Sequence, residues 1–295
     1  MLVPLLRLLA RLPLKWLHRA GAGLGWLVYW LSPTYAARLR ENLYASGVCA
    51  DPAACRVLLH QAIAETGKGV TELIAVWFGS DDKVSDLVAC DTWSVAEQAQ
   101  REGHGIIFLT PHLGCFEISA LYIAQRLPIT VMYRPPRLSW LEPLMIAGRQ
   151  RWRAIVAPAN LRGVRMFYKA LQRGEAVGLL PDQAPGVGEG AWAEFFGRPA
   201  YTMTLVGRLQ KASGAAVVMV FAERLPQGRG YHLQFQSVPA GNLDEVTLNR
   251  AIETLIRRCP AQYLWGYNRY KVPAGAVAPA AGKERGEGRE EGASQ

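Results

Sequence analysis

Hydrophobic positions along the chain alternate between a helical spacing and short apolar runs. Segment 55–79 places Ile63, Val70, Ile74 and Trp77 at helical intervals. Segment 105–110 (GIIFLT) is almost wholly apolar and is bounded by glycine and proline, as a short buried strand is. The same criteria predict helices at 93–102, 117–126, 161–172, 202–213 and 244–258, and strands at 129–133, 176–180, 215–223 and 231–238.

This order of elements predicts an α/β fold. Strands separated by helices build a sheet that is covered on both faces, so we expect a single domain with a mostly buried mixed β-sheet flanked by helices. The predicted elements place that domain at residues 32–272. From residue 273 the sequence turns to alanine, glycine and proline and then to charged residues, which predicts a disordered tail at 273–295.

The N-terminal segment 1–31 is apolar and basic. No acidic residue precedes Glu41, and four basic residues recur at every fourth position, namely Arg7, Arg11, Lys15 and Arg19. The most apolar stretch, 24–31, is shorter than the roughly 20 residues that cross a bilayer. We predict a membrane-anchoring helix at 1–31 whose basic flank contacts anionic lipid on the cytoplasmic side of a membrane. Whether it spans the membrane or lies on it stays open, and simple packing on the domain is the alternative.

Composition narrows the class of protein. Half of the 295 residues are hydrophobic, which excludes a mainly disordered chain, and the absence of serial apolar spans excludes a polytopic membrane protein. The net charge of +9 predicts an acidic partner. The five cysteines are scattered without a C-x-x-C pair, so neither a zinc knuckle nor a full disulfide framework is indicated, and a reducing cytoplasm is the simplest setting.

One constellation carries chemistry. His112 and Glu117 flank a turn that contains Pro111 and Gly114 and directly follows the strand at 105–110. If His112 lies in the turn and Glu117 in the first turn of the next helix, the carboxylate can hold one imidazole nitrogen while the other takes a proton from a hydroxyl. The pair lacks its own nucleophile, so the nucleophile would be a substrate alcohol. A histidine that only caps the helix is the alternative.

The sequence around this pair resembles a known family. The His-x4-Glu motif is followed by Tyr-Arg-Pro at 133–135, GLLPDQ at 178–183, EFFG at 194–197 and QYLWGYNRYK at 262–271. This ordered series is similar to that of the lipid A late acyltransferases, the lauroyl and myristoyl enzymes within the glycerolipid acyltransferase superfamily. Two positions depart from the family pattern, because Cys115 replaces the more usual asparagine and Tyr267 stands where many members have histidine.

The resemblance implies a reaction and its participants. A fatty acyl chain would pass from acyl-acyl carrier protein, the co-substrate, to a hydroxyl of a Kdo-bearing lipid A precursor on the cytoplasmic face of the cell inner membrane. No cofactor or metal is implied. His112 would deprotonate the acceptor hydroxyl, and Glu117 would orient His112 and favour its imidazolium. Backbone N–H groups of the turn, or Arg134, would stabilise the oxyanion.

Basic residues predict where these partners bind. Nine basic residues and one acidic residue lie between 134 and 173. Four of them recur on one face of the predicted helix 161–172 and the residue after it, where we expect acyl carrier protein to dock, namely Arg162, Arg165, Lys169 and Arg173. Substrate binding is predicted for Arg134, Arg149, Arg151, Asp182 and Gln183. The alternatives are a solvated helix face for the basic row and a strand-ending turn for Asp182 and Gln183.

Other functions remain open at this stage. An acyltransferase for another membrane amphiphile, such as a glycerophospholipid or ornithine lipid, is the main alternative. Nucleic-acid binding is suggested by the charge alone, and because no recognisable binding motif accompanies that charge we expect no nucleic-acid partner. No HExxH, GxSxG or P-loop motif occurs, so the sequence does not support a metalloprotease, a serine hydrolase or a P-loop NTPase.

Overall fold

The fold is centred on one mixed sheet. The computed structural model describes residues 2–136, 138–239, 241 and 243–279. Within these residues the sheet has the strand order β1-β9-β8-β2-β5-β3-β4. β9 is antiparallel to β8, and every other neighbouring pair is parallel. The strands are β1 Val88–Cys90, β2 Ile106–Leu109, β3 Ile129–Tyr133, β4 Ala154–Pro158, β5 Ala176–Leu179, β8 Ala216–Arg224 and β9 Tyr231–Ser237. The predicted mixed α/β sheet is confirmed.

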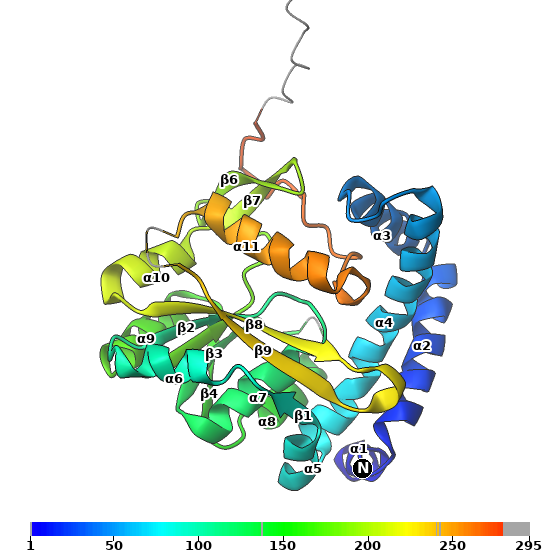
Figure 1. Ribbon diagram of the computed structural model, residues 1–295, viewed down its shortest axis with the longest axis horizontal. Coiled ribbons are helices and arrows are strands. Elements are labelled where there is room, and N and C mark those ends of the chain that lie inside the picture. The colour runs from blue at the N-terminus through cyan, green and yellow to red at the C-terminus, as the bar shows by residue number, and fades with distance from the viewer. Residues whose placement is uncertain (1, 137, 240, 242, 280–295) are drawn as a thin grey trace, which may run out of the picture.

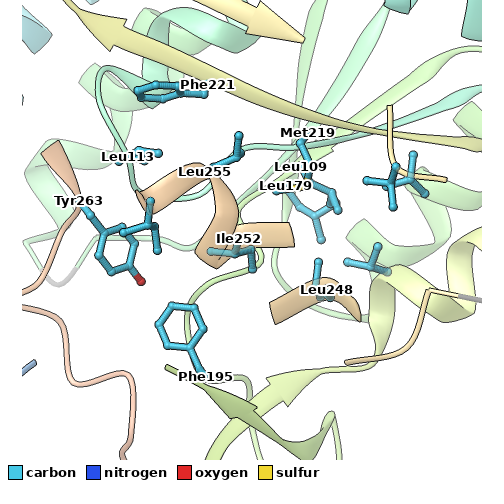
Figure 2. Packing of buried hydrophobic residues seen from close by; sticks show 14 of the residues in the cluster. Leu109, Leu113, Leu179, Phe195, Met219, Phe221, Leu248, Ile252, Leu255 and Tyr263 are labelled. Carbon is cyan, nitrogen blue, oxygen red and sulfur yellow. The ribbon is translucent and has the colours of Figure 1, made fainter. Parts of the chain in front are cut away.

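Two hydrophobic cores lie on the two faces of this sheet. Because successive side chains of a strand point to opposite faces, Ile107 and Leu109 of β2 join one core, whereas Ile106 and Phe108 join the other. Figure 2 shows the first core, where strand residues such as Leu109 lie above Ile252 of the helix α11. A strand buried on both faces has few polar positions, which is why GIIFLT is almost wholly apolar.

Helices cover both faces (Figure 1). The first core is covered by α3 Pro33–Ala45, α9 Leu161–Gln172, α10 Leu205–Ser213 and α11 Glu245–Arg258. The second is covered by α5 Asp81–Asp86, α6 Ser94–Arg101 and α7 Phe116–Arg126, with α8 Glu142–Arg149 beside α7 and β4. The long helix α4, Pro52–Phe78, contributes to both cores. Most predicted elements are therefore confirmed to within a few residues.

A small hairpin lies apart from the main sheet. β6, Gly190–Phe195, pairs with β7, Arg198–Met203, in antiparallel register. The prediction of a helix at 202–213 was wrong at its start, because β7 extends to Met203 and α10 begins only at Leu205. The hairpin, β1 and β4 were not predicted. Phe195 and Phe196 turn inward at the hairpin and pack in the first core.

The N-terminal segment forms two helices, not one. α1, Leu2–Leu9, and α2, Leu14–Leu31, are separated at Pro13, and α2 packs along α4. None of the described helices combines the length and the apolar character that crossing a bilayer requires. A disulfide joins Cys49, in the loop before α4, to Cys55 in the first turn of α4, a pairing that the sequence analysis did not single out. The predicted disordered tail lies mostly at 280–295, outside the described residues.

Candidate active site

His112 lies in a tight turn between β2 and α7. The turn requires glycine at position 114, which has a positive φ of 60° and lies so close to β8 that a Cβ would meet the Ala222 carbonyl oxygen at 2.0 Å. The C-terminal segment fixes this turn, because the Leu264 N–H donates to the His112 carbonyl at 3.0 Å and the Gly114 N–H donates to the Gln262 carbonyl at 3.1 Å. His112 is therefore held on both sides by backbone.

A buried carboxylate holds the His112 ring. Asp182 follows β5, the strand beside β2, so the carboxyl ends of two parallel strands bring the two residues together. The Asp182 Oδ1 is 2.8 Å from the His112 Nδ1, and its Oδ2 accepts from the His112 N–H at 3.0 Å. Burial by itself would raise the pKa of Asp182, but the interactions with His112 outweigh it and hold the pKa below its usual value. Asp182 is therefore a carboxylate when it orients the ring.

Glu117 has different partners from those predicted. It accepts from Arg149 Nε at 2.8 Å and from Trp77 Nε1 at 3.1 Å, and Arg149 Nη2 also donates to it. Among the described residues, the carboxylate bound to His112 is that of Asp182, and the predicted contact between His112 and Glu117 is not formed. The reason is that Glu117, in the first turn of α7, faces α4 and α8.

The second ring nitrogen of His112 is also contacted. The side-chain amide nitrogen of Gln183 lies 3.1 Å from His112 Nε2. When Nδ1–H donates a hydrogen bond to Asp182, Nε2 carries a lone pair and accepts a hydrogen bond from this amide. The tautomer set by Asp182 is thus the one in which Nε2 can act as a base. Asp182 and Gln183, which were predicted to bind substrate, both contact the His112 ring. Asp182 does so as the carboxylate that orients the ring.

The backbone N–H groups of the turn are already engaged. Those of His112 and Gly114 donate to Asp182 and Gln262, and those of Leu113 and Cys115 donate to the Pro111 and Ala222 carbonyls. The predicted use of these groups as oxyanion donors therefore does not fit the turn as it stands. Arg134, the other predicted donor, follows β3 and is exposed.

The two remaining residues predicted to bind substrate, Arg149 and Arg151, pair with different carboxylates. Arg149 is paired with Glu117. Burial by itself would lower the pKa of Arg149, but the Glu117 carboxylate outweighs burial, so the pKa is raised above its ordinary value. Arg151 precedes β4, where it donates to the Val76 carbonyl at 3.0 Å and pairs with Asp81. The Arg151 guanidinium thus links α4, α5 and the segment before β4, and its role in substrate binding stays a prediction.

The basic row predicted for carrier-protein docking lies on one surface. Arg162, Arg165, Lys169 and Arg173 are exposed, whereas Phe167 and Leu171 are buried against the sheet. α9 begins just after the carboxyl end of β4 and therefore runs from the His112 edge of the sheet towards the opposite edge. Arg173, at the far end, donates to Glu175. The helix amphipathicity is confirmed, and carrier-protein docking stays a prediction.

The closing block 262–271 supports the site. The Tyr267 hydroxyl accepts from the Ala184 N–H at 3.1 Å, next to the Asp182–Gln183 pair. Gln262 both donates to the Arg224 carbonyl and accepts from the Arg224 N–H on β8. Tyr267, which departs from the family pattern, therefore supports the turn that carries Asp182 and Gln183. The block gave no local signal for this role.

An apolar cavity of about 50 Å³ opens beside the turn. It lies between the sheet and α7, with Thr110, Glu117 and Arg149 among its lining residues. Gly178 on β5 forms part of its wall, and a Cβ there would lie 3.2 Å from Ile129 and Val131.

Among the described residues, no group of three histidine, cysteine or acidic side chains is placed to hold a metal ion.

The fold and the site define a class: an α/β protein with a histidine oriented by a buried carboxylate, an arrangement that can transfer a proton. Comparison with known proteins is more specific. Residues 1–272 match the family model for bacterial lipid A biosynthesis acyltransferases, so the chain belongs to that family and is an O-acyltransferase.

Two relatives from Escherichia coli (strain K12) illustrate the similarity. The chain is 29% identical over 247 residues to a lipid A biosynthesis palmitoleoyltransferase, covering 81% of this chain and 75% of the relative. It is 26% identical over 281 residues to a lipid A biosynthesis lauroyltransferase, covering 92% of this chain and 90% of the relative. The predicted family is thus confirmed over nearly the whole chain.

Proposed function

We propose that this protein transfers a fatty acyl chain from acyl-acyl carrier protein to a hydroxyl of a Kdo-bearing lipid A precursor. The observation that carries the proposal is His112, held by Asp182 in the tautomer of a base, in a chain of the lipid A acyltransferase family. Relatives named for the transfer of different acyl groups support the reaction class. Among the described residues, the His112 ring contacts Asp182 and Gln183 and no hydroxyl or thiol group, which fits attack by a substrate alcohol.

The residues suggest the following step. His112 Nε2 removes the proton from the acceptor hydroxyl while the hydroxyl oxygen bonds to the thioester carbonyl carbon. Asp182 stabilises the imidazolium that forms. The carbon–sulfur bond then breaks, and His112 returns the proton to the departing sulfur. Gln183 must leave Nε2 as the hydroxyl arrives, and its amide can then donate to the oxyanion.

Glu117 and Arg149 act as positioning residues in this proposal. Their ion pair joins the first turn of α7 to the end of α8 at the wall of the apolar cavity. We place the start of the acyl chain in this cavity, since its lining is mainly apolar and it adjoins the His112 turn. The present space is too small for a whole fatty chain, so side chains such as Met132 must move, which the flexible thioether permits.

Acyl carrier protein, an acidic protein, is proposed to dock on the exposed basic face of α9. Reversing the charge of Arg165 and Lys169 together should raise the apparent KM for acyl carrier protein at low salt, because complementary charge steers association. The matched control reverses Arg250 and Arg257, two exposed arginines on α11. An unchanged KM in the α9 variant, or equal changes in both variants, would contradict docking on α9.

We further propose that the protein works at the cytoplasmic face of the inner membrane. The exposed side of α1 and α2 carries large apolar residues, of which Leu8 is 58%, Trp16 52%, Trp30 70% and Leu31 74% exposed. Packed helices with an apolar outer side and interspersed basic residues suit a bilayer surface.

The deciding assay combines purified protein, acyl carrier proteins loaded with chains of different lengths, and the Kdo-bearing lipid A precursor. We expect product with at least one chain length and loss of product in His112→Ala. Absence of product with every chain, from folded protein, would overturn the proposed acceptor or donor. Thioester hydrolysis that persists and depends on His112 would retain the base and reject the acceptor.

A further inference from the structure

A second, larger cavity lies away from His112. Its volume is about 640 Å³, and it is formed by α2, by Lys68 on α4 and by the turn between β8 and β9. Figure 1 shows this turn reaching α4 and α2 at the edge of the molecule. The approach is close, because a Cβ on Gly228 of the turn would lie 2.3 Å from the Lys15 backbone nitrogen.

The cavity is lined by positive charge. Lys15, Arg19, Lys68 and Arg229 contribute four cationic side chains, and no carboxylate is among the described residues that line the cavity. Lys68 is paired with Glu65, whereas none of the ion pairs among the described residues involves Lys15, Arg19 or Arg229. Three cations from two elements that are distant in sequence thus face one space.

The charge behind the cavity is neutralised. His18 lines the cavity, is 5% exposed and contacts Glu72 at 3.2 Å. Arg224 donates twice to the same Glu72, at 2.8 and 2.6 Å. Because Arg224 already balances Glu72, this carboxylate does not cancel the positive field in the cavity.

The rim of the cavity has the chemistry of a bilayer surface. Trp16 is about half exposed. Its ring centroid lies 4.8 Å from the guanidinium carbon of Arg19 and 5.8 Å from Nζ of Lys15. Leu12 is exposed one turn before Trp16. An indole next to cations is typical of the headgroup region, where an amphipathic ring meets both apolar chains and phosphate.

We propose that this cavity binds the phosphate headgroup of an anionic membrane lipid, held by Lys15, Arg19 and Arg229. The proposal builds on the membrane association proposed above and names a site for it. It requires no acyl transfer, so its test is independent of the reaction. The multiple cations favour a phosphate, and the apolar rim favours one that is carried by a lipid.

The experiment measures binding to vesicles of phosphatidylcholine with and without phosphatidylglycerol. The cavity variant is Arg19→Gln with Arg229→Gln, and the control is Arg7→Gln with Arg11→Gln, which removes equal charge from exposed positions outside the lining. We expect the cavity variant to bind phosphatidylglycerol vesicles about tenfold more weakly than the control does, at unchanged melting temperature. Equal losses in both variants would show charge attraction without a site and overturn the proposal.

A soluble arm identifies the ligand. Short-chain phosphatidylglycerol below its micelle concentration should bind saturably to the wild type and not to the cavity variant, and inorganic phosphate should compete only weakly. Competition by inorganic phosphate at equal concentration would assign the site to free phosphate and reject the lipid. Selective loss of acyl carrier protein binding in the cavity variant, with lipid binding intact, would also reject it.

Discussion

At the scale of single residues, the orientation of His112 depends on two contacts to one carboxylate. Asp182 accepts hydrogen bonds from both the ring Nδ1–H and the backbone N–H of His112. These two bonds fix the rotamer and the tautomer of the ring. Gln183 on the other nitrogen and Tyr267 beneath Ala184 complete this arrangement. A single side chain thus sets both the direction and the tautomer of the proposed base.

Asp182→Asn tests this role. The amide keeps the size of the side chain but removes its charge, so the imidazolium loses its stabilising partner. We expect kcat to fall by about 10²–10⁴-fold with little change in KM. Asp244→Asn is the control, because Asp244 is an exposed helix cap for which asparagine is an equivalent residue. A kcat within twofold of wild type in steady-state assays would reject Asp182 as the orienting group.

At the scale of elements, the packing of α2 on α4 depends on glycine. A Cβ at Gly67 of α4 would lie 2.0 Å from the Gly21 carbonyl oxygen, and one at Gly25 would lie 2.2 Å from the Ile63 carbonyl oxygen. The two backbones therefore approach each other directly. The Thr71 hydroxyl donates to the Leu17 carbonyl at 2.7 Å at the same interface.

Gly67→Ala should destabilise the protein by about 1–3 kcal/mol or more, because the added methyl group forces the helices apart. Gly23→Ala is the matched control, since a Cβ there has nothing within 4 Å and alanine favours a helix. Denaturant unfolding of both variants measures the difference. Equal stabilities would show that α2 and α4 are not packed through these glycines.

The disulfide between Cys49 and Cys55, at the start of α4, gives a further prediction at this scale. Protein isolated in air and unfolded in urea should titrate three thiols, those of Cys90, Cys115 and Cys259, and five after reduction. Closing so short a loop stabilises the fold by about 2 kcal/mol in the chain-entropy account. Five thiols without reductant, counted with a thiol reagent, would contradict the pairing.

At the scale of the whole molecule, one buried ionic network connects the N-terminal helices to the sheet. Glu72 on α4 contacts His18 on α2, and it accepts from Arg224 at the end of β8 and from the Tyr231 hydroxyl on β9. Burial raises the pKa of Glu72, but Arg224 and His18 together lower it to about 2. Arg224 also donates to the Gly114 carbonyl at 3.3 Å, so the network reaches the His112 turn.

The depressed pKa fixes how stability depends on pH. Because Glu72 is a stronger acid in the folded chain, its contribution is complete above its ordinary pKa of 4.5 and is lost as the pH falls towards 2. Glu72→Gln should cost about 3–5 kcal/mol at pH 7, since it leaves the buried Arg224 incompletely paired. Urea unfolding between pH 7 and pH 3 should show the gap to wild type narrowing.

Glu65→Gln is the control for Glu72→Gln, because Glu65 contacts the same arginine but is partly exposed. It should cost less at every pH. A gap between wild type and Glu72→Gln that stays constant from pH 7 to pH 3 would contradict an ionised Glu72 in this network.

The features that depend on local pattern follow from the sequence alone. Burial on both faces required the apolar run of β2, amphipathic spacing gave α9 its basic face, and Gly114 after Pro111 marked the turn that carries His112. The ordered motifs also indicated the family that the comparisons confirm. Each of these follows from residues within a few positions of one another.

Which distant residues meet depends on the tertiary structure. Asp182 lies 70 positions after His112 and reaches it because β2 and β5 are parallel neighbours, whereas Glu117, five positions away, turns towards Arg149. His18 and Glu72, 54 positions apart, meet because α2 packs on α4. Contacts between distant segments depend on strand order and helix packing. The number of residues between two positions does not predict either of them.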